Sequence, residues 1–214
     1  MSCRMFFVRH GQSLGNKFDK FLGITDLDLS DLGKKQAELT AGYLKNEEID
    51  VIYASDLIRA YHTALPLAKL KGLEITKDSR LREINAGLWE NKRFDLLEKE
   101  FPESYEKVWL HDIGNAKADG GESVAELTER IYNAVTDIAK ENAGKTVAVF
   151  SHATPIRAFF NKIYGRSLSQ MADLPWPNNA SVSEALFDSS TFKPVRYSYD
   201  EFMGDLSTSL PENC

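Results

Sequence analysis

The pattern of apolar and polar positions divides the chain into short buried strands separated by amphipathic helices. Five of the six residues 3–8 are apolar, and residues 146–151 form a second apolar run of the same kind. Runs of this length are typical of strands that are buried on both faces of a parallel sheet. Residues 50–55 follow the same pattern. We therefore expect three central strands, each of which ends in polar residues.

Helices are expected between these strands. Ser30 is a suitable N-cap for a helix over residues 31–46, and a second helix is expected from Asp56 up to Gly72, with Pro66 inside it. The spacing of Ser123 and Glu126 predicts a capping box, followed by a helix to about residue 142. Another helix is expected after the strand at residues 146–151.

The remaining segments give weaker signals. We expect a strand at residues 73–76, an extended segment at 81–84, a helical segment at 92–111 and a hairpin from 181–187 and 195–199. The tail beyond Asp200 is expected to be a loose or frayed cover. The order of elements predicts an α/β fold: one domain, residues 1–214, built as a three-layer α/β/α sandwich around a mostly parallel sheet.

Composition narrows the class of protein. The chain has 214 residues, 43% hydrophobic content and a formal net charge of −6, which argues against binding to nucleic acid through a basic face. Its two cysteines, Cys3 and Cys214, form no ligand-like pair, and this fits a reducing compartment. No stretch approaches the roughly 18 apolar residues of a membrane span. We expect a cytoplasmic protein with no membrane partner and no cofactor.

Charged and imidazole side chains follow the predicted strands. Arg9 and His10 come directly after the first strand, Arg59 lies near the start of a helix, and His152 follows the strand at residues 146–151. In open α/β sheets, ligands bind beyond the carboxyl ends of the strands. Two arginines could neutralise a phosphate monoester, which carries about two negative charges, and a histidine could attack phosphorus. The alternative without a function is a strand that simply ends in solvated polar residues.

A metal site is a further alternative for His10 and His152. Such a site normally recruits carboxylates or cysteines, and neighbouring arginines repel a cation. We therefore expect no metal.

The motifs resemble those of the histidine phosphatase superfamily, also called the phosphoglycerate mutase-like family. They occur in the family's order over residues 6 to about 160. The matching residues are Arg9-His10-Gly11 with Ser13 and Asn16, Ser55-Asp56 with Arg59, Thr63 and Ala64, Leu81-Arg82-Glu83 with Gly87 and Trp89-Glu90, Gly121-Glu122-Ser123, and Ser151-His152.

The resemblance implies a role for each site residue. His10 would be the nucleophile that becomes phosphohistidine, Arg9 and Arg59 would hold the phosphoryl oxygens, and His152 would stabilise the transferring group. Glu83 would give a proton to the leaving alkoxide and then act as the base for water. The further phosphate-binding residues implied are Ser13, Asn16, Gly23 and Thr25.

Structural alternatives remain for Glu83 and for a group of aromatic residues. Glu83 could be only a salt-bridge partner of Arg82 or Arg80. The aromatic residues at positions 94, 101, 105 and 109 are expected to pack in the core or in a lid, rather than to stack on substrate. The poor periodicity around them suggests that residues 85–122 form a cap over the site.

Departures from the family pattern concern the substrate. Leu22 stands before Gly23 where many of the family's phosphatases have glutamine, and Thr25 could compensate in part. Asn91 replaces the glycine of a Trp-Glu-Gly motif. The long insertion with Arg-Tyr-Gly that is typical of the mutases is missing, which favours a phosphatase.

Two other function classes remain open: a mutase of sugar phosphates, for which Lys92 and Arg93 could supply extra charge, and a non-catalytic binder of phosphorylated ligands. The intact set of histidines, arginines and glutamate disfavours the binder. The expected partners are a small phosphorylated substrate and the phosphate product, with a homo-oligomer as an open alternative.

Overall fold

Strand β1 (Cys3–Arg9) lies at the centre of a computed structural model that describes residues 1–210. The main sheet has six strands in the order β4-β3-β6-β1-β7-β8. Strands β1, β3, β4 and β6 are parallel, and β7 is antiparallel to β1 and to β8. The bounds are β3 Val51–Ala54, β4 Ile75–Lys77, β6 Thr146–Ser151, β7 Val182–Asp188 and β8 Thr191–Tyr199. The predicted mostly parallel sheet and its hairpin are confirmed.

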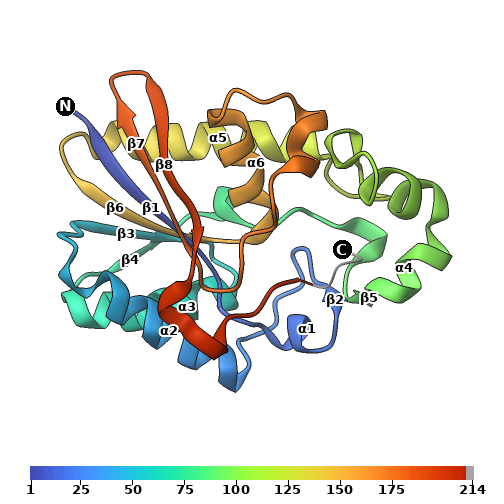
Figure 1. Cartoon of the computed structure of the whole chain (residues 1–214), viewed down its shortest axis with the longest axis horizontal. Helices are drawn as coiled ribbons and strands as arrows, with labels where there is room; N and C mark the ends of the chain where they lie inside the picture. The colour runs from blue at the N-terminus through green and yellow to red at the C-terminus, as the bar shows by residue number, and fades with distance from the viewer. Residues whose placement is uncertain (211–214) are drawn as a thin grey trace.

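Helices cover both faces of this sheet (Figure 1). Phe6 and Val8 pack in one core cluster with α2 (Asp31–Tyr43) and α3 (Ile58–Lys71). Met5 and Phe7 point to the opposite face and pack with α5 (Val124–Glu141) and α6 (Ala153–Ile163). Because successive residues of a strand face opposite sides, an apolar run must be covered on both. The predicted three-layer α/β arrangement is confirmed.

The helix ends agree with local capping signals at three places and differ at one. Ser30 accepts a hydrogen bond from the Gly33 amide, Ser123 forms the capping box, and Gly72 ends α3 in the left-handed conformation. The prediction that Asp56 begins a helix is wrong, since α3 begins at Ile58. A distant carboxylate, that of Asp26, accepts from the Ile58 amide at 2.7 Å.

Several short elements have no clear sequence signal. They are α1 (Leu14–Lys17), β2 (Lys20–Phe21), β5 (Lys92–Arg93) and 3₁₀ turns at Leu44–Asn46, Ser79–Leu81, Gly87–Trp89, Ile113–Asn115, Leu168–Asp173 and Glu201–Leu206. The expected extended segment at 81–84 is instead the end of a 3₁₀ turn followed by irregular chain. The weak strand expected at 73–76 is β4, which begins two residues later, at Ile75.

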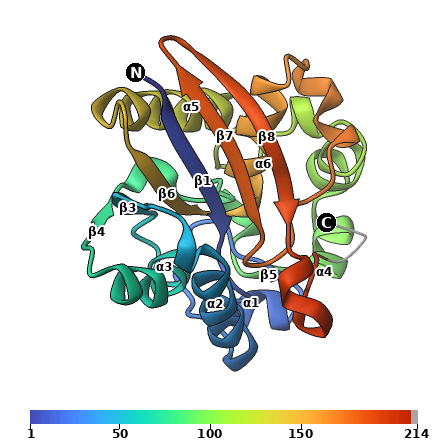
Figure 2. The same cartoon turned by 60° about the vertical axis from the view of Figure 1, so that its left-hand side comes forward.

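Residues 85–122, here called the cap, lie at one side of the sheet beside α5 (green in Figures 1 and 2). The expected helical segment at 92–111 is present as α4 (Phe94–Glu100) and a π-helix (Pro102–Trp109). Strand β5 pairs with β2, which joins the cap to the loop after β1. Phe94, Tyr105 and Trp109 are buried in a cluster of their own. These aromatic residues therefore pack together as expected, although Phe94 and Trp109 also line a cavity.

The tail beyond Asp200 is held by hydrogen bonds to α2 and to the segment before β7. Gln36 Nε2 donates to the Leu206 carbonyl at 2.7 Å and to the Thr208 hydroxyl at 2.9 Å. The Asn179 amide donates to the Thr208 carbonyl at 2.8 Å. Fraying, one of the two states expected of this tail, is therefore wrong as far as Thr208, and Cys214 lies outside the described residues. No helix within residues 1–210 has the length and apolar character needed to cross a membrane.

Candidate active site

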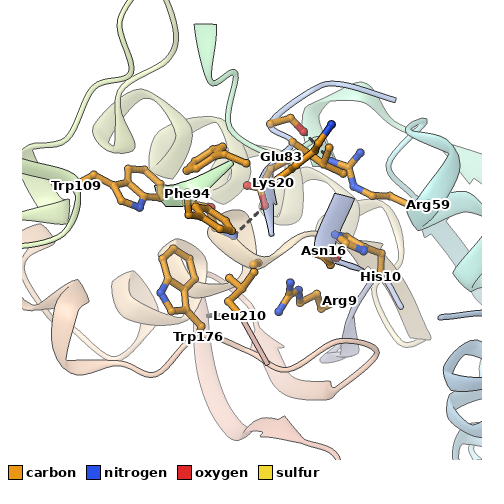
Figure 3. Close-up of a pocket in the computed structure, with 15 residues that line it drawn as sticks. Arg9, His10, Asn16, Lys20, Arg59, Glu83, Phe94, Trp109, Trp176 and Leu210 are labelled. Atoms are coloured by element: carbon orange, nitrogen blue, oxygen red, sulfur yellow. Dashed lines mark hydrogen bonds between the residues drawn. The ribbon is translucent and has the colours of Figure 1, made fainter. Parts of the chain in front are cut away.

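His10 and His152 are brought together by two neighbouring strands. Strands β1 and β6 pair in parallel with Arg9 opposite Ser151, so the residues that follow them lie side by side. The two imidazole ring centroids are 5.1 Å apart and their planes are inclined by 60°. Arg59 reaches the same place from the first turn of α3. Figure 3 shows Arg9, His10, Asn16 and Arg59 on one side of a cavity that all four of them line.

His10 has one ring nitrogen held by the backbone. Nδ1 lies 2.7 Å from the Gly11 carbonyl oxygen, which can only accept, so Nδ1 carries the hydrogen. Burial, reinforced by the charges of Arg59 and Arg9, lowers the pKa of His10 well below its usual range. The imidazole is therefore neutral at pH 7, and its lone pair is on Nε2. His10 lines the cavity.

His152 lies behind His10 and is fully buried. Its Nε2 is 2.8 Å from the Ser55 hydroxyl, and its Nδ1 has no hydrogen-bond partner among residues 1–210. Burial, with a smaller contribution from the Arg59 charge, lowers the pKa of this imidazole as well. His152 contacts the ring of His10 but is not among the residues that line the cavity.

Two buried arginines supply the positive charge of the cavity. Arg9 donates from Nη1 to the Pro177 carbonyl at 2.6 Å. Arg59 donates from Nη1 to the Thr25 carbonyl at 2.8 Å and from Nη2 to the Gly23 carbonyl at 2.7 Å. Burial lowers the pKa of Arg59 to about 10, so the guanidinium stays charged at neutral pH. Because these carbonyl groups are neutral, they orient Arg59 and leave its charge available to an anion.

Glu83 lines the cavity from the segment before the cap. Its Oε1 accepts from the Ile84 amide at 2.8 Å, and its Oε2 accepts from the Thr154 amide of α6 at 3.3 Å. Burial raises the pKa of this carboxyl, while the two amide bonds and the Arg59 charge oppose the shift. The salt-bridge alternative is not realised, because Arg82 pairs with Asp56, and Arg80 pairs with Asp78 and Asp137.

Arg130 of α5, which sequence reasoning missed, holds the irregular segment that carries Glu83. Nη1 donates to the carbonyls of Arg80 and Arg82 at 2.7 and 3.0 Å, and Nη2 donates to that of Glu83 at 3.3 Å. The same guanidinium pairs with both carboxylate oxygens of Glu122. The matched Gly121-Glu122-Ser123 motif was the available sequence signal for this arrangement, although it did not indicate that Arg130 is the partner of Glu122.

Asn16 and Ser13 occupy different positions relative to the cavity. The Asn16 Oδ1 accepts from the Ser13 amide and hydroxyl at 3.1 and 2.9 Å and from Asn179 Nδ2 at 3.3 Å. These donors fix the amide of Asn16, which lines the cavity. Ser13 is fully buried as the N-cap of α1 and does not line it. Ser13 therefore has a capping role in the structure, and its phosphate contact stays a prediction.

Gly23 and Thr25 are also separated by the structure. Gly23 lines the cavity, whereas Thr25 does not. The Thr25 hydroxyl donates to Glu90 at 2.5 Å, and only its backbone carbonyl serves the site, by holding Arg59. The Thr25 hydroxyl is thus engaged by Glu90, and its compensation for the glutamine that Leu22 replaces stays a prediction.

Part of the cavity wall is apolar, and in Figure 3 Phe94, Trp109 and Trp176 lie on the side away from His10 and Arg59. The apolar lining residues include Phe21, Leu22, Phe94, Trp109, Trp176 and Leu210, and Lys20 also lines the cavity. Lys20 Nζ donates to Asn91 Oδ1 at 3.1 Å. Asn91 has φ of 60°, a conformation that suits glycine or asparagine, which accounts for its place in the motif. Lys20, Trp176 and Leu210 were not identified from the sequence.

Comparison with known protein families gives a match over residues 5–200 to the model described as histidine phosphatase superfamily (branch 1). Phosphoserine phosphatase 1 of Hydrogenobacter thermophilus is 36% identical over 167 residues, 78% of this chain and 79% of that protein. The Yersinia pestis protein named "Probable phosphoglycerate mutase GpmB" is 33% identical over 162 residues, 76% of this chain and 75% of that protein.

Solved structures share the same fold over nearly the full length. A mycobacterial glucosyl-3-phosphoglycerate phosphatase aligns with a TM-score of 0.85 and 26% identity, covering 92% of this chain and 99% of the other. YhfR of Bacillus stearothermophilus aligns with a TM-score of 0.89 and 24% identity over 94% and 99% of the two chains. On the family match over residues 5–200 and the identity to these relatives, the chain belongs to the histidine phosphatase superfamily, branch 1.

Proposed function

We propose that this protein is a phosphomonoester hydrolase that acts on a small phosphorylated metabolite through a phosphohistidine at His10. The observation that carries the proposal is the state of His10: a neutral imidazole with its lone pair on Nε2, at the wall of a cavity that also holds Arg9 and Arg59. Nucleophile and counter-charges for a phosphate dianion are thus present together. Membership of the family and the named activities of its relatives support the same reaction.

The reaction follows from the positions of these groups. Nε2 of His10 attacks phosphorus, the nitrogen–phosphorus bond forms, and the bond to the leaving oxygen breaks. Arg9, Arg59 and Asn16 bind the phosphoryl oxygens. The two arginines also stabilise the negative charge of the phosphoryl group during the transfer. His152 packs against the His10 ring and supports it.

Glu83 gives its proton to the leaving alkoxide in the first step. Burial raises the pKa of this carboxyl, which favours the protonated form that the step needs. In the second step the resulting carboxylate takes a proton from water, whose oxygen attacks phosphorus. The nitrogen–phosphorus bond then breaks, and inorganic phosphate and neutral His10 are regenerated.

Hydrolysis is favoured over a mutase reaction by the charges of the cavity. A second anionic group on the substrate would need further cations, and among the described lining residues only Lys20 adds to the two arginines. Lys92 and Arg93, the candidates for this role, pair with Glu100 and Asp95 and do not line the cavity. The mutase remains the second candidate because the GpmB relative carries that name.

No metal takes part in the proposed reaction. Arg9 and Arg59 supply the charge that a divalent ion would otherwise bring, and the described residues contain no group of three or more His, Cys, Asp or Glu side chains placed to hold one. The cytoplasmic location, the homo-oligomer and the movement of the cap remain predictions.

A screen of phosphorylated metabolites for released phosphate, with and without EDTA, tests the proposal. We expect hydrolysis of at least one phosphomonoester at an unchanged rate in EDTA. Phosphoryl transfer between phosphoglycerates without release of phosphate would favour the mutase. A rate abolished by EDTA and restored by a divalent ion would contradict the metal-free reaction.

A further inference from the structure

We propose that Glu90 is a positioning residue for Arg59 and acts through the loop of residues 23–25. Glu90 belongs to the Trp89-Glu90 motif, to which the reaction assigns no role, and it is not among the residues that line the cavity. The inference rests on the proposed function, because it concerns how the phosphate-binding arginine is held.

The carboxylate of Glu90 binds one side of this loop. Oε1 accepts from the Ile24 amide at 2.9 Å, and Oε2 accepts from the Thr25 amide at 2.8 Å and the Thr25 hydroxyl at 2.5 Å. Oε1 also accepts from the Ala86 amide at 2.9 Å, so the carboxylate joins the loop to the first residues of the cap. Charge-assisted bonds of this kind are stronger than neutral ones.

Arg59 binds the other side of the same loop. Its two terminal nitrogens donate to the carbonyls of Gly23 and Thr25. The backbone amides of Ile24 and Thr25 thus point to the Glu90 carboxylate, and the carbonyls of Gly23 and Thr25 point to the Arg59 guanidinium. Since Arg59 is buried and both of its terminal nitrogens bind this loop, the loop determines where the remaining N–H groups of the guanidinium point.

Gly23 allows this approach. Its φ is 50°, and a Cβ at this position would lie 2.1 Å from Glu90 Oε1. Any other residue would push the carboxylate away from the loop. The glycine and the close approach of Glu90 are therefore parts of one arrangement.

The charge of Glu90 also acts on Arg59 across the neutral loop. It helps to keep the guanidinium protonated against the effect of burial, together with the charges of Glu83 and Asp26. Removal of Glu90 therefore eliminates both the anchor of the loop and a compensating charge, while every group proposed to touch the phosphate remains in the protein.

Titration calorimetry with inorganic phosphate tests the inference without relying on turnover. We expect Glu90→Ala to weaken phosphate binding by about tenfold or more, and Thr25→Val, which removes one donor to the carboxylate, to weaken it less. Glu100→Gln is the matched control, because Glu100 is a cap carboxylate that pairs with Lys92 at the surface. This control should bind phosphate like the parent protein.

A double-mutant cycle with Arg59→Lys separates positioning from general destabilisation. If Glu90 acts through Arg59, adding Glu90→Ala to Arg59→Lys should weaken phosphate binding little further. Additive losses, or equal phosphate affinity in the parent and Glu90→Ala, would overturn the inference. If Glu90→Ala does not fold, Glu90→Gln replaces it in the cycle, because the amide keeps the size but offers N–H groups to loop amides.

These results are distinct from a failure of the proposed function. In that case the parent protein would hydrolyse no phosphomonoester, whatever the Glu90 variants bind.

Discussion

His10 and His152 lie with ring centroids 5.1 Å apart, yet only His10 lines the cavity. The parallel pairing of β1 with β6 places them, and different partners distinguish them: the Gly11 carbonyl for His10 and the Ser55 hydroxyl for His152. Both rings are neutral because burial near the arginines lowers their pKa. This relationship favours His10 for the attack on phosphorus and a supporting position for His152.

The Glu83→Gln variant should lose activity in proportion to how poor the leaving group is. An alkoxide needs a proton as it leaves, whereas p-nitrophenolate is stable without one. General acid catalysis is typically worth about 10²–10⁴-fold, so single-turnover phosphorylation of the enzyme should fall by that factor with an alkyl phosphate and clearly less with p-nitrophenyl phosphate. Equal losses would remove the acid role and leave Glu83 as an electrostatic or structural residue.

The free energy of unfolding should fall as the pH falls below about 6.5. The folded protein keeps His10 and His152 neutral at a pH where the unfolded chain, with its ordinary pKa of 6.5, already binds protons. The decrease is at most about 1.4 kcal/mol per pH unit for each histidine.

Urea unfolding at pH 7.5 and 5.5 measures this decrease, and His10→Gln should reduce it. The raised pKa of Glu83 acts in the opposite direction, since its uncharged form favours the folded state at low pH. The parent and the His10→Gln variant share that contribution, so their difference isolates His10. An identical pH dependence of stability in the two proteins would refute the assignment of a depressed pKa to His10.

The Lys20→Met variant should change substrate preference rather than general activity. Lys20 is the one lysine among the described residues of the cavity wall, and its Nζ is held by Asn91. We expect kcat/KM to fall about tenfold for a phosphomonoester whose leaving group carries a carboxylate, such as 3-phosphoglycerate, because a charge-assisted hydrogen bond is removed. The value for p-nitrophenyl phosphate should hardly change.

Lys17→Met is the matched control for Lys20, because Lys17 lies nearby on α1 but outside the cavity wall. Similar losses for both substrates in Lys20→Met, or in the control, would argue against direct binding of the leaving group by Lys20.

The Arg130→Met variant should resemble Glu83→Gln in its dependence on the leaving group. Arg130 holds the carbonyls of Arg80, Arg82 and Glu83 and does not line the cavity. Its removal should displace the Glu83 carboxyl and lower the rate mainly for alkyl phosphates. Arg130→Lys should restore part of the rate. A uniform loss across leaving groups would point to destabilisation of the fold alone.

Local patterns in the sequence predicted the elements that place the reacting groups. The apolar run before Arg9, the one that ends at Ser151 and the capping box at Ser123 are each contained within a few residues, so β1, β6 and α5 appear where expected. The family motifs added the candidates around the cavity. Ser13 matches the motif as a phosphate ligand, but its spacing to Asn16 also suits a helix cap, which is what the structure shows.

The parts that were missed depend on contacts between distant segments. Asp26 caps α3 from 32 residues away, and Arg130 binds carbonyls 47 to 50 residues before it. Trp176 lines the cavity, and Glu90, although part of a matched motif, binds the loop of residues 23–25, because segments distant in sequence pack together. No periodicity or spacing within one element contains this information.

Trapping the phosphoenzyme tests the central claim most directly. The protein is mixed with a radiolabelled phosphomonoester, quenched within the first turnover, digested and analysed by mass spectrometry. We expect one acid-labile phosphoryl group on His10, and neither label nor turnover in His10→Ala, whose circular dichroism and Tm show an intact fold. Hydrolysis retained by His10→Ala, or a label on another residue, would contradict covalent catalysis through His10.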